Sequence, residues 1–113
     1  MAYNLGQLIV FSVKFLDAAG ADVDPTTVEF WLREEVDGTE LHWILTPPAT
    51  VVQTPAGMNA ITRDSAGDFH VNFIARKPER ITVHWIGSTA VTVRPAQDVV
   101  YVRHSGIVAI DHP

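Results

Sequence analysis

Residues 5–32 read LGQLIVFSVKFLDAAGADVDPTTVEFWL, and this stretch decides the fold. In its first part an apolar side chain recurs at every second position, the set being Ile9, Phe11, Val13 and Phe15. A β-strand with one buried face has this period of two. A loop rich in Asp, Gly and Pro follows, and the alternation resumes near Val28. The stretch therefore predicts two β-strands joined by a loop, at the start of a small β-sandwich.

The rest of the chain continues as short alternating segments separated by turn residues. Asp37-Gly38 is a dipeptide that accepts the backbone angles of a tight hairpin, so the strand over 27–36 is expected to turn back antiparallel. Together with a first strand over 7–16, further strands are expected over 39–45, 59–63, 68–75, 80–86, 91–94 and 99–104. Seven or eight short antiparallel strands predict an all-β, immunoglobulin-like β-sandwich. One such domain is expected to take up residues 1–113.

The composition excludes some kinds of chemistry and makes some kinds of binding partner unfavourable. Cysteine is absent, which excludes disulfides, thiolate metal sites and a Cys nucleophile. Thirteen acidic and eight basic side chains give a net charge of -5, which repels phosphates, so neither a nucleic acid nor a membrane partner is expected. The N-terminus has no pattern of a signal peptide or a membrane span, so the chain is expected to be made and kept soluble. Hydrophobic residues make up 47%, which favours burial of some surface by another subunit.

Side chains that could bind a metal or catalyse a reaction are present, but their spacing does not favour a site. The five histidines form no His-x-His or His-x3-His pair; they are His42, His70, His84, His104 and His112. The acids of the first loop are better explained as turn residues than as calcium ligands; they are Asp17, Asp22 and Asp24. No serine lies in a nucleophile motif. We expect no cofactor, no metal, no catalytic residue and no enzymatic activity.

Two tryptophans and a proline-rich segment remain as candidate functional features. Trp43 lies on the same face of its strand as Leu41 and Leu45, and its ring is expected to be part of the core. Trp31 shares a face of its strand with Glu29 and Arg33. Either it points outward, where a ring can anchor a protein contact or stack on a sugar, or a second sheet or a change of register buries it. Residues 46–58 hold three of the seven prolines and are expected to be an irregular crossing between the two sheets.

Several motifs, taken in order along the chain, resemble a known group of proteins. They are the opening stretch with Val23 to Val28 reading VDPTTV, the segment RDSAGDFHVNF with Gly67 and Phe69, and the strand end ITVHWIGSTA with Trp85 and Gly87. Between residues 5 and 93 this order is similar to small immunoglobulin-like structural proteins encoded by tailed bacteriophages and prophages. Residues 91–113 contain no matching motif.

The resemblance implies a virion component, either a capsid decoration protein or a neck or tail accessory subunit. Such a protein is made in the host bacterial cytoplasm, is oligomeric in the assembled particle, and acts through contacts with other virion proteins. The apolar residues Ile107, Val108 and Ile110 follow the last expected strand, so residues 105–113 are expected to form a contact arm that adds a strand to a neighbour. The alternative is a carbohydrate or surface-binding module in which Trp31, Trp43 and the proline-rich segment form a platform.

Overall fold

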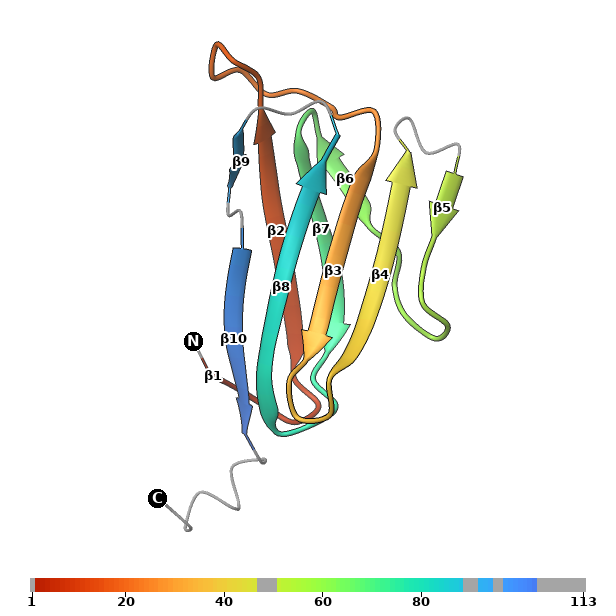
Figure 1. Cartoon of the computed structure of the whole chain (residues 1–113), viewed down its shortest axis with the longest axis vertical. Coiled ribbons are helices and arrows are strands. Elements are labelled where there is room, and N and C mark those ends of the chain that lie inside the picture. Colours follow the sequence, from red (N-terminus) through yellow and green to blue (C-terminus); the bar gives the residue numbers. More distant parts are fainter. Residues whose placement is uncertain (1, 47–50, 89–91, 95–96, 104–113) are drawn as a thin grey trace.

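The computed structural model describes residues 2–46, 51–88, 92–94 and 97–103, which form two β-sheets (Figure 1). The larger sheet has six strands in the order β1-β10-β8-β3-β4-β5, and the smaller has four in the order β6-β7-β2-β9. The strands are β1 Ala2–Asn4, β2 Leu8–Leu16, β3 Val28–Glu34, β4 Thr39–Thr46, β5 Val51–Gln53, β6 Thr62–Ser65, β7 Asp68–Ile74, β8 Glu79–Gly87, β9 Thr92–Arg94 and β10 Gln97–Arg103. The described part of the chain contains no helix that is long and apolar enough to span a membrane.

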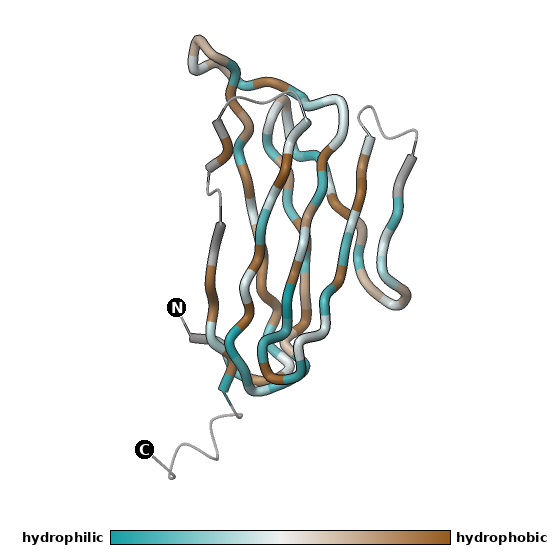
Figure 2. Tube along the Cα trace, in the orientation of Figure 1, coloured by the Kyte–Doolittle hydropathy of each residue, from teal (hydrophilic) through white to brown (hydrophobic). Residues whose placement is uncertain are grey.

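The two strands of the opening stretch alternate as predicted. Every second residue of β2 is buried, and β3 repeats this pattern. Figure 2 shows hydrophobic and hydrophilic residues in alternation along β3 and its neighbours in the larger sheet. The two strands nevertheless lie in different sheets, because β2 pairs with β7 whereas β3 pairs with β4 and β8. The loop between them is therefore the first crossing of the sandwich.

The predicted hairpin after β3 is confirmed. The antiparallel register of β3 and β4 runs to Glu34 opposite Thr39, and Gly38 in the connecting turn has a φ of 76°. A side chain at such a positive φ is disfavoured, which explains the glycine. Among the described strands, β1 and β10 pair in parallel and the other neighbouring strands are antiparallel, so the expectation of a wholly antiparallel sandwich is wrong for the pair β1 and β10.

Some strands begin or end at residues other than those predicted from the sequence. Residues 46–58 were expected to be irregular throughout, yet Val51–Gln53 forms β5 and pairs with β4. The crossing between the sheets is confirmed, because β5 belongs to the larger sheet and the next strand to the smaller one. That next strand, β6, begins at Thr62 rather than at residue 59. Residues 105–113, with Ile107, Val108 and Ile110, lie outside the described residues.

The core between the sheets is rich in aromatic rings. Phe30 lies at its centre, with its ring centroid 4.5 Å from that of Trp85, 5.0 Å from that of Trp43 and 5.5 Å from that of Phe11. Trp43 is fully buried, and its indole N–H donates to the carbonyl oxygen of Asn59 at 2.8 Å. The buried ring thus keeps a hydrogen bond, as buried indoles usually do. The prediction that Trp43 belongs to the core is confirmed.

The acids of the first loop are engaged in turn and loop contacts. Asp17 Oδ1 accepts the backbone N–H groups of Ala19 and Ala21 at 2.9 and 3.0 Å. Asp24 Oδ1 accepts the N–H of Gly67 at 2.9 Å, and its carboxylate also accepts hydrogen bonds from Arg63. The Arg63 guanidinium lowers the pKa of Asp24 against the opposing effect of burial. These contacts tie the first crossing to the turn between β6 and β7.

Candidate functional site

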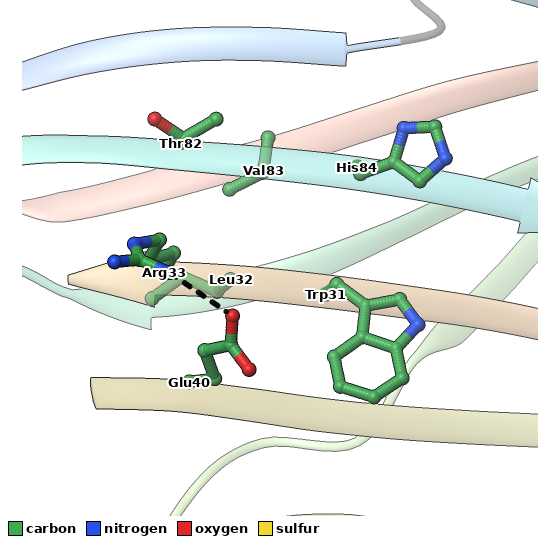
Figure 3. Close-up of a pocket in the computed structure, with 7 residues that line it drawn as sticks. All are labelled: Trp31, Leu32, Arg33, Glu40, Thr82, Val83 and His84. Carbon is green, nitrogen blue, oxygen red and sulfur yellow. Dashed lines mark hydrogen bonds and ion pairs between the residues drawn. The ribbon is translucent and has the colours of Figure 1, made fainter. Parts of the chain in front are cut away.

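Trp31 lies on the outer face of the larger sheet, which is one of the two positions that its alternation left open. Its side chain is 36% exposed, and it is opposite His42 on β4 and His84 on β8 in the strand register. Figure 3 shows the indole extending over the side of β3 nearer β4, while His84 lies on the other side of β3. Trp31 is therefore placed between two polar neighbours on a central strand of the sheet.

The orientation of the Trp31 ring is set by a stacked pair. The rings of Trp31 and His42 are nearly parallel, with an interplanar angle of 12° and centroids 3.7 Å apart. His42 Nε2 lies 2.8 Å from Glu29 Oε1, which holds the imidazole in place. One face of the indole is consequently covered by His42, so a ligand or partner can reach only its other face and its edge.

A shallow hollow lies beside this ring. It has a volume of about 170 Å³ and is lined by Trp31, Leu32, Arg33, Glu40, Thr82, Val83 and His84 (Figure 3). Arg33 is one of the lining residues and forms ion pairs with Glu40 at 3.3 Å and with Glu35 at 3.1 Å. The hydroxyl of Thr82 donates to Glu35 Oε2 at 2.8 Å and lowers the pKa of that carboxyl against the opposing effect of desolvation. Arg33 lowers this pKa further. The polar groups are thus mostly paired with each other.

Apolar side chains extend the exposed surface from the hollow across β8 and β10. Val99 is opposite Thr82 in the register and Tyr101 is opposite Arg80. Both side chains are exposed, and so is that of Ile86 on β8. We call this surface the Trp31 face; it consists of Trp31, Arg33, Thr82, His84, Ile86, Val99 and Tyr101. It combines apolar area with polar groups, which is typical of protein contact surfaces.

A second apolar surface lies on the outer face of the smaller sheet. Leu8 and Ile74 are directly paired across β2 and β7, and Val10 is the next outward residue of β2. All three side chains are about half exposed. A hollow of about 310 Å³ adjoins Ile74 and is lined on its other side by Met58 and Asn59. We call Leu8, Val10 and Ile74 the β2 patch.

Sequence reasoning found Trp31 but missed the β2 patch and the exposed residues of β10. A signal was present, because Leu8 and Val10 are apolar at the outward positions of a strand whose other outward residues are Ser12 and Lys14. The three histidines in the described part of the chain form no common metal site. His42 bonds to Glu29, His70 Nδ1 lies 2.7 Å from Asp64 Oδ2, and within the described ranges no three metal-binding side chains form a group. His104 and His112 lie outside these ranges.

Close packing explains why glycine occupies positions 67 and 87, which belong to the motifs of the sequence resemblance. A Cβ on Gly67 would lie 2.7 Å from the backbone oxygen of Phe15, and the φ of this glycine is 76°. A Cβ on Gly87 would lie 2.6 Å from the Phe15 ring and 2.7 Å from Pro25. These two motifs therefore mark points where the first crossing packs closely against the sandwich.

No protein-family model matches the chain, and no curated protein matches it in sequence. Among solved structures, the extracellular portion of mouse CD200RLa is similar at 9% identity and a TM-score of 0.55, over 92% of this chain and 54% of that one. This chain thus spans about half of the CD200RLa structure. The ZIG-8 IG1 homodimer is similar at 13% identity and a TM-score of 0.46, over 92% of this chain and 78% of that one.

The order of the strands indicates the same fold as the similarity to the CD200RLa structure. A variable-type immunoglobulin domain has B, E and D strands in one sheet and G, F, C, C′ and C″ strands in the other. Here β2, β7 and β6 take the positions of B, E and D, and β10, β8, β3, β4 and β5 take those of G to C″. The chain has an immunoglobulin-like β-sandwich fold.

Proposed function

We propose that this chain is a non-enzymatic structural protein of a phage virion, either a capsid decoration protein or a neck or tail accessory subunit, that acts through contacts with other virion proteins. The observation that carries the proposal is the exposure of apolar side chains on the outer faces of both sheets. They form the Trp31 face and the β2 patch. Contiguous exposed apolar surface on a small soluble domain marks contact with another molecule.

Two further observations support contact rather than chemistry. Both described hollows are open; the one beside Trp31, at about 170 Å³, is smaller than a usual small-molecule site, and the one beside Ile74, at about 310 Å³, lies at the lower limit. Ligand sites for small molecules usually have about 300–1,000 Å³ and bury most of the ligand. The resemblance to phage structural proteins over residues 5–93 then supplies the class of partner. Made in the host cytoplasm, the chain would meet its neighbours during assembly of the particle.

The proposal is tested in the bacterial host that carries the gene. Particles are induced, purified by density gradient and analysed by quantitative mass spectrometry. We expect the chain in the particle fraction at a fixed ratio to the major capsid or tail protein. Recovery of the chain only in the soluble fraction, free of particles, would contradict the proposal. Portal, capsid protease or tail genes beside its coding sequence would support it independently.

The contact arm has its own test in the same preparation. Deletion of residues 105–113 is expected to reduce incorporation into particles, because Ile107, Val108 and Ile110 would supply apolar area to a neighbour. A matched variant carries Asp at these three positions and keeps the length of the chain. Unchanged incorporation of both variants would show that the arm has no role in assembly.

A carbohydrate-binding module is the second candidate, and the exposed ring of Trp31 favours it. An indole beside Arg33, Glu40, Thr82 and His84 offers a stacking surface with hydrogen-bonding groups. The platform expected from the sequence is wrong in one part, since Trp43 is fully buried and cannot contact a ligand. Screening the purified chain and its Trp31→Ala variant on a glycan array tests this candidate. Glycan binding that is lost in the variant would support it.

A further inference from the structure

Within the described part of the chain, one edge of β2 has no strand partner over most of its length. On one side, β2 pairs with β7 from Leu8 to Lys14. On the other side it pairs with β9 from Lys14 to Leu16. Among the described residues, no strand lies beside the segment from Leu8 to Val13 on that side. In Figure 1, β9 accordingly covers only the end of β2 that carries the arrowhead.

The register shows which backbone groups face this open edge. Gln7 O accepts the N–H of Ala75 at 3.0 Å, and Phe15 N donates to Gly67 O at 2.9 Å, so odd-numbered residues bond toward β7. Hydrogen-bonded and non-hydrogen-bonded pairs alternate along an antiparallel ladder. The N–H and C=O groups of Leu8, Val10 and Ser12 therefore point away from β7, toward the open edge.

The surroundings of this edge suit an added strand. In an immunoglobulin domain the position next to strand B is occupied by strand A. Here β1 lies in the other sheet, where it pairs with β10. An added strand would place one set of side chains beside Leu8 and Val10 on the outer face, and the other set beside the buried Ile9 and Phe11. Both sets would meet apolar neighbours.

We propose that the edge of β2 from Leu8 to Ser12 accepts the C-terminal segment 105–110 of a second copy of this chain as an added strand. The segment reads SGIVAI, and its β-branched residues favour an extended conformation with apolar side chains on both faces. Acidic or basic side chains, which would oppose burial, are absent from it. This inference rests on the proposed function. It adds to that function the identity of the partner, a second copy of the chain, and the site on β2 that accepts it.

The point at which the chain leaves the sandwich favours a second copy over the same copy. The carbonyl oxygen of Arg103 accepts the N–H of Leu5 at 3.0 Å, so β10 ends beside the turn that leads into β2. β10 and β2 run in opposite directions in Figure 1, so β10 is directed away from the open edge where it ends at Arg103. To pair with its own edge, segment 105–110 would have to reverse this direction, whereas the edge of a second copy does not require a reversal.

The first experiment measures self-association of the full chain by sedimentation velocity over a range of concentrations. Lys at an edge strand opposes strand addition, so Val10→Lys is expected to weaken association by at least about tenfold. Val36→Lys is the matched control, because Val36 is an exposed valine in the turn after β3. Thermal unfolding of both variants verifies that the fold is retained. Equal association of V10K and the wild type would overturn the proposal.

Amide hydrogen exchange locates the contact. The N–H groups of Leu8, Val10 and Ser12 are expected to exchange at least about tenfold more slowly at concentrations where the chain associates. Those of Ile9 and Phe11 bond toward β7 and serve as internal controls that remain protected throughout. Slow exchange of Leu8, Val10 and Ser12 in a strict monomer would show that the chain's own segment occupies the edge, and would overturn the second-copy assignment.

A mixture of two variants tests whether the β2 edge of one copy binds the C-terminal segment of another. V10K keeps an intact segment and V108D keeps an intact edge, so neither is expected to self-associate, whereas their mixture is expected to form a heterodimer. No association in the mixture would contradict the proposal. These measurements use the purified chain alone and are independent of the particle experiment. Association through β2 without incorporation into particles would reject only the virion role; incorporation without association through β2 would reject only this acceptor site.

Discussion

Arg76 donates two hydrogen bonds to the fully buried carboxylate of Glu34, from Nε at 2.7 Å and from Nη2 at 2.6 Å. Lys77 Nζ adds a third to the same carboxylate at 3.0 Å and also bonds to Asp37 Oδ2 at 2.6 Å. Burial would raise the pKa of Glu34, but the hydrogen bonds from Arg76 and Lys77 outweigh it and lower that pKa. The cluster connects the end of β3, the following hairpin turn and the link between β7 and β8.

Removal of the Glu34 carboxylate is expected to destabilise the fold. Glu34→Ala leaves Arg76 and Lys77 without their buried partner, and breaking such a pair costs about 3 kcal/mol. Glu40→Ala is the matched control, because Glu40 pairs with Arg33 at an exposed site, where the cost is about 0.5 kcal/mol. Urea unfolding at pH 7 measures both free energies. Equal losses in the two variants would show that burial does not strengthen the cluster.

A second carboxyl in this cluster has the opposite shift. Burial raises the pKa of Glu79, and the nearby Glu34 carboxylate contributes to the rise, against the effect of the Val36 N–H that donates to Glu79 Oε1 at 3.2 Å. Glu79 Oε2 is buried and has no hydrogen-bond partner among the described residues. Because the folded state holds this proton more tightly than the unfolded state, Glu79 decreases stability as pH rises through its unfolded and then its folded pKa.

Glu79→Gln removes this titration and is expected to stabilise the fold at pH 7 relative to the wild type, by on the order of 1 kcal/mol. The advantage should vanish below the unfolded pKa of a glutamate, about 4.3. Glu34 and Asp37 act in the opposite direction: their pKa values are lowered, so their stabilisation is lost as pH falls from about 4. Unfolding free energies of E79Q and the wild type from pH 3 to 8 measure both effects, and parallel curves would contradict this account of Glu79.

Gly57 and Gly67 have similar backbone angles, so alanine substitutions at the two positions distinguish the cost of a positive φ from the cost of a steric clash. Gly67 and Gly57 have φ of 76° and 78°, but a Cβ on Gly57 would meet nothing within 4 Å, whereas one on Gly67 would lie 2.7 Å from Phe15 O. Gly57→Ala is expected to cost about 1 kcal/mol from the positive φ alone. Gly67→Ala is expected to cost about 3 kcal/mol or more, since the backbone of β2 must also move. Thermal unfolding compares them, and similar melting temperatures would argue against the crowding.

The sequence predicted those features that depend on local periodicity. Alternation alone predicted β2 and β3 and the placement of Trp31 on the face opposite Phe30, because a side chain in a strand has only two directions. It did not predict that β2 and β3 lie in different sheets, or that β1 is parallel to β10, since strand pairing depends on contacts distant in sequence. The β2 patch could be predicted from Leu8 and Val10, but the open edge beside them depends on where β9 ends. The stacking of Trp31 on His42 required the register of β3 and β4.

The same substitution, Trp to Phe, is expected to lower stability more at the buried Trp43 than at the exposed Trp31. Trp43→Phe removes the hydrogen bond to Asn59 O and leaves unfilled volume beside Phe30, so a loss of about 2 kcal/mol is expected. Trp31→Phe keeps an aromatic ring over His42 at an exposed position, so the loss should remain below about 0.5 kcal/mol. Urea unfolding followed by circular dichroism measures both. If W31F is the more destabilised variant, the Trp31–His42 pair holds the sheet together, and the Trp31 face is part of the fold rather than a surface free for a partner.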